Sequence, residues 1–191
     1  MGKSSVISLK EIIDGTLHME ICSPDECFSM ELQKKHCEPI NELGEILFDI
    51  YDYYNENPDA AGSKNLYIFW ECESCQYSLE FILNPGQVIN ININHCPDIF
   101  AGIHTESELK LSIKTNLKHL MENLLEEMKN ILLAYGFVGY RRRWQQHDFP
   151  IATFLKLYNI LNGRHQEPTS LPRCLECLQK MVSKDFIFIE D

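Results

Sequence analysis

Two pairs of cysteines have a spacing that can bind a metal ion. Cys72 and Cys75 form "CESC", and Cys174 and Cys177 form "CLEC". Two such pairs are the half-sites of a Cys₄ zinc centre, in which four thiolates surround the ion as a tetrahedron. Local zinc modules place their halves about 15 to 20 residues apart, whereas 98 residues separate Cys75 from Cys174. The pattern therefore leaves two interpretations: four core thiols with no cofactor, or a structural zinc site assembled by the tertiary fold.

Other chemistry finds little support among the cysteines. Cys22 and Cys27 bracket the turn "SPDE", where a disulfide is possible under oxidation. Two thiols are the expected state, because the sequence shows no secretory signal. "CESC" precedes the strand-like "QYSLEF" and not a helix, so a thioredoxin-type motif is not predicted. No Gly-rich phosphate loop, GxSxG or HExxH is present. We therefore expect a protein that is not an enzyme.

An unbroken run of acidic residues is the second feature with chemical meaning. Seven acids and no Lys or Arg occur between Glu38 and Asp59, at alternating separations of four and three residues. This spacing places the first six within an arc of about 80° on an α-helix, opposite an apolar face. Like charges at i,i+4 destabilise a helix by roughly 0.2 to 0.5 kcal/mol per pair. The run therefore lowers the stability of the helix slightly, and a function would explain why it is present.

The acidic helix face is predicted to bind a partner, because aromatic side chains flank it. Phe48 and Tyr53 fall on its two sides, and aromatic groups beside complementary charge are typical of interface hot spots. The predicted partner-binding residues are Glu42, Glu45, Phe48, Asp49, Asp52, Tyr53 and Glu56. Two alternatives remain, a merely solvated helix face and internal pairing with "RRRW" at Arg141–Trp144.

Overall charge narrows the class of partner. The 191 residues carry a net charge of −11, and residues 1–105 contain 5 basic against 17 acidic side chains. Nucleic acid is an unlikely ligand for such a chain, since duplex binding depends on Lys and Arg neutralising phosphates. A basic protein is the expected partner, and an immunity protein that inhibits a nuclease toxin is the most concrete hypothesis. The alternative is a zinc-stabilised regulatory or nucleic-acid adaptor protein that makes its contact through "RRRW".

Hydropathy places the protein away from membranes. No stretch approaches the roughly 18 to 20 apolar residues needed to span a bilayer, and charges interrupt the N-terminal segment too early for a signal peptide. We expect a cytoplasmic protein with no membrane partner, folded as one domain over residues 1–191. Its acidic, strand-rich part covers 1–105 and its helical part covers 106–191.

Local patterns predict an α+β fold. An N-terminal hairpin and an antiparallel β-meander should pack against three to four α-helices, because strands come first and helices later without βαβ alternation. The hairpin is expected at 16–22 and 27–33, and the meander at 66–72, 76–83 and 87–93. Helices are expected at 38–59, 105–136, 151–162 and 172–182, followed by a strand at 185–190.

Overall fold

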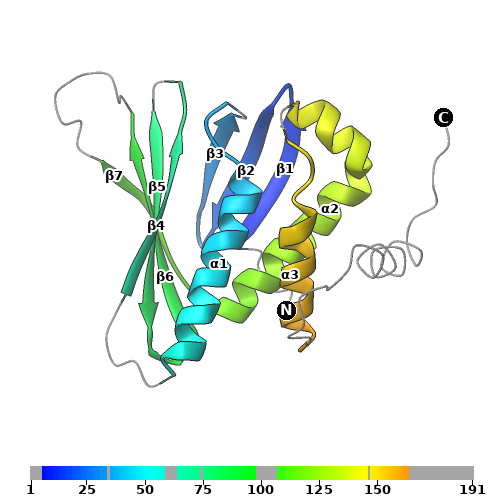
Figure 1. Cartoon of the computed structure of the whole chain (residues 1–191). Helices are drawn as coiled ribbons and strands as arrows, with labels where there is room; N and C mark the ends of the chain where they lie inside the picture. The colour runs from blue at the N-terminus through cyan, green and yellow to red at the C-terminus, as the bar shows by residue number, and fades with distance from the viewer. Residues whose placement is uncertain are drawn as a thin grey trace.

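A computed structural model shows two antiparallel β-sheets and three α-helices within its described residues, 6–33, 35–58, 64–73, 75–97, 107–145 and 147–163. The predicted α+β class is confirmed (Figure 1). The strands are β1 (Ile7–Ile13), β2 (Thr16–Cys22), β3 (Cys27–Gln33), β4 (Lys64–Glu71), β5 (Gln76–Asn84), β6 (Val88–Cys96) and β7 (Glu108–Asn116). The helices are α1 (Pro39–Glu56), α2 (Leu117–Trp144) and α3 (Ile151–Leu161), with a 3₁₀ turn η1 (Pro85–Gln87). The helix predicted at 172–182 and the strand at 185–190 lie outside the described residues.

The three-stranded sheet has the order β1-β2-β3 and contains the predicted hairpin. β2 and β3 pair from Thr16 opposite Gln33 to Cys22 opposite Cys27. Strand β1 was not predicted, although Asp14-Gly15 before β2 is a strong hairpin signal. Both of these residues have positive φ angles, 48° and 80°, as two-residue hairpin loops require.

The four-stranded sheet has the order β4-β5-β6-β7, so the predicted meander gains a fourth strand. β7 occupies residues that were predicted as the start of a long helix, and that prediction is wrong. Leu111 and Ile113 are buried while Ser112 and Lys114 between and after them are exposed, which is a strand period of two. Ile113 pairs with Ile91 of β6. The segment therefore pairs with the edge of β6 and extends the sheet.

Helix α2 begins later than predicted and continues beyond its predicted end. Its N-cap is Asn116, whose side chain accepts a hydrogen bond from the His119 N–H at 2.9 Å. Gly136 was predicted as the terminal residue, and its φ of 61° does break the helix there. The chain then turns helical again as far as Trp144.

The helices and both sheets share one hydrophobic cluster. In Figure 1 the four-stranded sheet lies to the left of α1, the three-stranded sheet lies behind it, and α2 and α3 lie to its right. Helix α1 contacts β4, α2 and α3, so it occupies the centre of the arrangement. Its buried apolar face is the predicted one, formed by Ile40, Leu43, Leu47, Ile50 and Tyr54.

Helices α1 and α3 approach each other closely at a glycine. Gly44 of α1 faces the methyl group of Thr153, and a Cβ atom added at Gly44 would overlap that methyl. The Thr153 hydroxyl donates a hydrogen bond to the Asn41 side-chain oxygen at 2.5 Å. This bond holds Thr153 in place, so the methyl cannot easily turn away.

We expect Gly44→Ala to destabilise the protein. Overpacking a core contact costs about 1 to 3 kcal/mol, which exceeds the gain of roughly 1 kcal/mol from better helix propensity. Thr153→Ser removes the methyl and keeps the hydroxyl, so the double variant should recover part of the loss. Urea denaturation of the three variants measures this. Equal stability of Gly44→Ala and the double variant would contradict the close contact.

Candidate functional site

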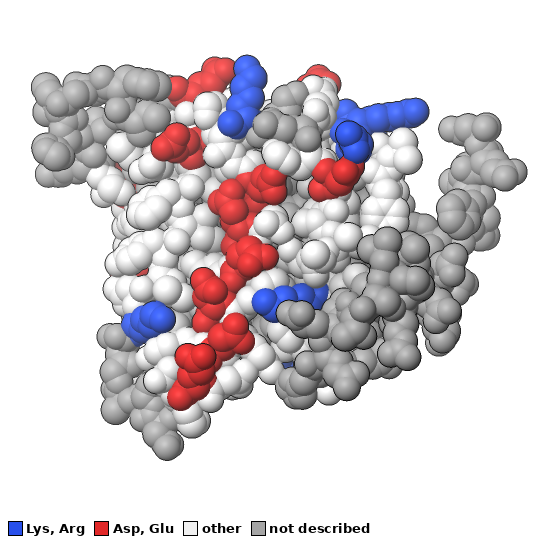
Figure 2. Space-filling view, in the orientation of Figure 1, with Lys and Arg blue, Asp and Glu red and all other residues white. Residues whose placement is uncertain are grey.

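The acidic residues from Glu38 to Glu56 form a stripe along α1. Some of these carboxylates are exposed to solvent, and others contact residues within the fold. Glu45, Asp49, Asp52 and Glu56 are exposed, and we refer to these four as the acidic face. None of them makes a hydrogen bond or ion pair with another described residue. Figure 2 shows acidic side chains in a continuous line along the part of the surface where α1 lies in Figure 1. The acidic face is thus a row of solvated, unneutralised carboxylates on one rigid element.

Glu38 and Glu42, at the start of the stripe, make contacts that stabilise the fold. One Glu42 carboxylate oxygen accepts the indole N–H of Trp70 at 2.8 Å, and the other accepts the backbone N–H of Glu38 at 2.7 Å. Trp70 of β4 is completely buried, so this bond satisfies a donor that water cannot reach. The Glu38 carboxylate pairs with His147 at 2.6 Å. Glu42 was predicted as a partner-binding residue, and the structure places it in a structural role.

The two predicted aromatic residues differ in exposure. Phe48 is only 2% exposed, so it does not border the acids on the surface as predicted. The Lys156 ammonium of α3 lies 4.0 Å from the centroid of its ring. Tyr53 is half-buried, and Lys64 of β4 lies 4.7 Å from its ring centroid. The prediction is wrong for Phe48, because a helical wheel cannot show that α3 packs over the edge carrying it, and it stays a prediction for Tyr53.

The acidic residues of α1 continue to its C-terminal end, where they interact unfavourably with the helix dipole. Acidic side chains stabilise the first turn of a helix, where the N-terminus is partly positive, and destabilise the last turn. Glu56 lies in the last turn, which has no basic residue. The acidic face is therefore uncompensated within its own helix.

The "RRRW" segment is largely engaged within the fold. Arg141 makes two hydrogen bonds to Asp148, at 2.8 and 3.0 Å. The Arg143 guanidinium lies 4.6 Å from the centroid of the Tyr135 ring and donates to the Ile12 carbonyl at 3.4 Å. Trp144 is buried. No described contact joins these arginines to the acidic face, so the internal pairing considered from the sequence is not observed among the described residues.

Of the two predicted zinc half-sites, the one formed by Cys72 and Cys75 lies within the described residues. The backbone N–H of Cys72 donates to the carbonyl oxygen of Cys75 at 2.8 Å, so the two residues lie opposite each other. Burial, followed by the neighbouring Cys75 thiol, raises the pKa of Cys72 to about 12. Cys174 and Cys177 lie outside the described residues. Within those residues, the one group of three close metal-binding side chains is a different one, described next. Zinc binding by Cys72, Cys75, Cys174 and Cys177 thus stays a prediction.

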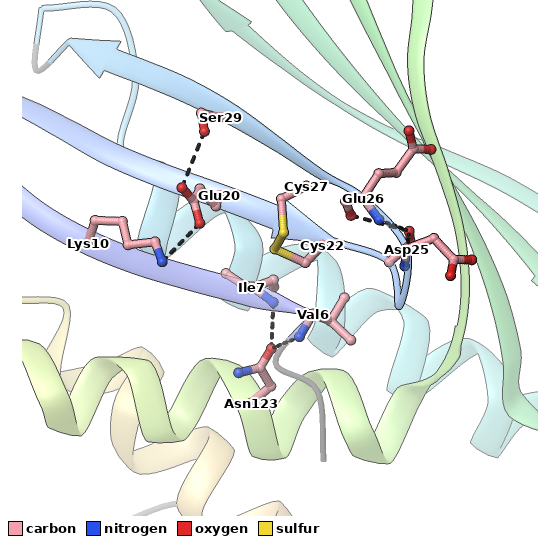
Figure 3. The surroundings of a disulfide bond; sticks show 11 residues. Val6, Ile7, Lys10, Glu20, Cys22, Asp25, Glu26, Cys27, Ser29 and Asn123 are labelled. Atoms are coloured by element: carbon pink, nitrogen blue, oxygen red, sulfur yellow. Dashed lines mark hydrogen bonds and ion pairs between the residues drawn. A yellow bond between two sulfur atoms is a disulfide. The ribbon is translucent and has the colours of Figure 1, made fainter. Parts of the chain in front are cut away.

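Cys22 and Cys27 form a disulfide, and the expectation of two thiols is wrong for this pair (Figure 3). The register of β2 and β3 places them directly opposite each other with their Cα atoms 4.1 Å apart. Opposite residues are closest at such non-hydrogen-bonded positions. Glu20 lies next to the two sulfurs. Because both sulfurs are in the disulfide, this group offers no thiolate to a metal.

Comparisons with known proteins leave the family open. No family model matches the chain, and no curated protein matches it. A solved structure of a protein with unknown function from the DUF155 family, from Prochlorococcus sp. NATL2A, aligns with 12% identity and a TM-score of 0.29. The alignment covers 59% of this chain and 93% of that one, and a likeness at this level supports neither a shared fold nor a shared function. No described helix is long and apolar enough to cross a membrane.

We expect Glu42→Ala to lower the free energy of unfolding by about 1 to 3 kcal/mol, because it leaves the buried indole N–H of Trp70 without an acceptor. Glu42→Gln keeps an acceptor oxygen and should lose less. Glu45→Ala on the same stripe is the matched control and should stay within about 0.5 kcal/mol of the parent protein. Chemical denaturation measures all three. Equal losses from Glu42→Ala and Glu45→Ala would contradict the division of the stripe.

Proposed function

We propose that the protein is a non-enzymatic binding protein whose acidic face neutralises a basic partner. The most concrete form of the proposal is an immunity protein that inhibits a nuclease toxin in the cytoplasm. The observation that carries it is the row Glu45, Asp49, Asp52 and Glu56, exposed and without an ion-pair partner among the described residues. Glu42 and Phe48 are left out of the contact surface, because both are engaged within the fold.

Helix geometry suits this row to a surface that binds phosphates. Residues three and four apart stack along one helix face with Cβ atoms about 5 to 6 Å apart. Phosphates along one nucleic-acid strand have a spacing of the same order, so a nuclease cleft lined with Lys and Arg can accept the row in place of its substrate. Because the acids are fixed on a folded helix, they lose little additional entropy on binding.

Electrostatic steering is the kinetic part of the proposal. A chain with a net charge of −11 attracts a basic partner at long range. Complementary charge raises the association rate more than it raises final affinity, and salt screens this effect. Lys64 and Lys156 flank the acidic face through their contacts with Tyr53 and Phe48. Their positive charges repel a basic partner on either side of α1. They therefore confine its binding to the acidic face and contribute to specificity.

The test is binding to a panel of purified basic nuclease domains, measured by surface plasmon resonance at increasing salt. The association rate should fall steeply between about 0.01 and 1 M salt, over which the screening length drops from roughly 30 to 3 Å. Glu45→Lys combined with Asp49→Lys should abolish binding. Glu11→Lys combined with Asp25→Lys changes the net charge by the same amount at exposed sites in β1 and in the β2–β3 turn, away from α1. This control variant should retain binding.

Folding and binding effects separate cleanly in this experiment. Glu45→Lys with Asp49→Lys removes like-charge repulsion along α1, so its melting temperature should be equal to or above that of the parent protein. A loss of binding therefore cannot come from unfolding. Binding that is weak for every nuclease domain and unchanged by this double variant would overturn the proposal.

A further inference from the structure

The β4–β5 hairpin ends in a pair of cysteines placed for bond formation. The backbone N–H of Cys72 donates to the carbonyl oxygen of Cys75 at 2.8 Å, one step beyond the paired residues Glu71 and Gln76. Opposite residues in a hydrogen-bonded antiparallel pair have Cα atoms about 5.5 Å apart. That separation lies inside the range of roughly 4.4 to 6.8 Å that disulfides span. The Cβ atoms of opposite residues are about 4.5 to 5.5 Å apart and those of a disulfide about 3.5 to 4.5 Å, so Cys72 and Cys75 need only a small approach to be joined.

The two thiols differ in accessibility. Cys72 is 9% exposed, and its thiol donates to the Glu31 carbonyl of β3 at 3.6 Å. Cys75 is only half-buried. A reagent in solution thus reaches Cys75 first, and the neighbouring Cys72 can attack only a sulfur already attached to Cys75.

The same chain shows the oxidised form of a comparable arrangement. Cys22 and Cys27 close the β2–β3 hairpin as a disulfide, whereas Cys72 and Cys75 close the β4–β5 hairpin as thiols. Both pairs lie at the end of a hairpin, across from each other. The second pair is accordingly a dithiol whose two residues face each other across the end of the hairpin.

We propose that Cys72 and Cys75 are a redox-active dithiol that reduces low-molecular-weight disulfides of the glutathione class. The Cys75 thiolate attacks one sulfur of the reagent, and the other half leaves as a thiol. The sulfur of Cys72 then attacks the Cys75 sulfur, and the second half leaves as a thiol. One reagent disulfide is reduced, the protein dithiol is oxidised, and the two protein protons end on the two released thiols.

Oxidation also changes a contact between the two sheets. The S–H group of Cys72 is the donor to the Glu31 carbonyl, and Cys72 belongs to the hairpin of the four-stranded sheet while Glu31 belongs to β3. Disulfide formation removes that proton. The redox state of the pair therefore sets whether this hydrogen bond between the sheets exists.

The experiment treats the full-length protein with oxidised glutathione and maps its cysteines by mass spectrometry. Glu73 lies between the two cysteines, so cleavage after Glu73 separates them and a Cys72–Cys75 disulfide appears as two linked peptides. The parent protein should form this bond and keep no glutathione at either residue. Cys72→Ser should keep glutathione on Cys75, because the second attack is lost. Cys75→Ser should react at Cys72 at least about tenfold more slowly than Cys72→Ser reacts at Cys75.

Cys96→Ser is the matched control, because Cys96 is a half-buried cysteine at the end of β6, and this variant should form the Cys72–Cys75 bond as the parent does. A stable glutathione adduct on Cys75 of the parent protein would overturn the proposal. So would the absence of reaction at both cysteines. Reaction seen only after addition of a zinc chelator would also overturn it and would assign the two thiols to a metal site.

Discussion

Helix α1 lies between β4 and the other two helices, and its contacts orient the acidic face. This helix packs against β4, α2 and α3, and its apolar side chains join the cluster that both sheets share. At Gly44 the backbone of α1 lies against the Thr153 methyl group of α3, and at the other end the Tyr54 hydroxyl donates to the carbonyls of Asn84 and Val88, at 2.8 and 3.0 Å. These contacts define the rotation of α1 about its axis. Because that rotation is defined, the acids on the opposite side point into solvent.

Burial on one side of α1 and repulsion on the other are two parts of the same energy balance. Removing apolar surface from water contributes about 25 cal/mol per Å², so burial of roughly 20 Å² offsets the few tenths of a kcal/mol lost to one like-charge pair. The fold can therefore carry an unneutralised row of carboxylates. The stripe also contributes directly to stability at one point, since Glu42 accepts the indole N–H of the buried Trp70. A stripe that looks uniform in sequence thus combines a structural residue with a solvated row.

Hairpin register decides the chemistry of the cysteines. Cys22 and Cys27 fall opposite each other at the close, non-hydrogen-bonded position, and their sulfurs are bonded. Cys72 and Cys75 fall at a hydrogen-bonded position, and their thiols remain free. Side chains approach more closely at the first kind of position than at the second. The register of each hairpin therefore sets how closely its two cysteines approach each other.

The features that depend on near neighbours in the chain could be predicted from the amino-acid sequence. The amphipathic α1, the β2–β3 hairpin, the meander β4–β6 and the helix α3 all follow from periodicity and turn residues, which act over a few positions. Other features depend on contacts between residues that are far apart in the chain. Residues 108–116 pair with the edge of β6, and the alternation of Leu109, Leu111 and Ile113 with polar residues was a local strand signal that the longer helix pattern masked. Phe48 is buried because α3 covers it, and Glu42 is occupied because Trp70 of β4 needs an acceptor. For these two residues the deciding partner is distant in sequence, so no local pattern could have revealed it.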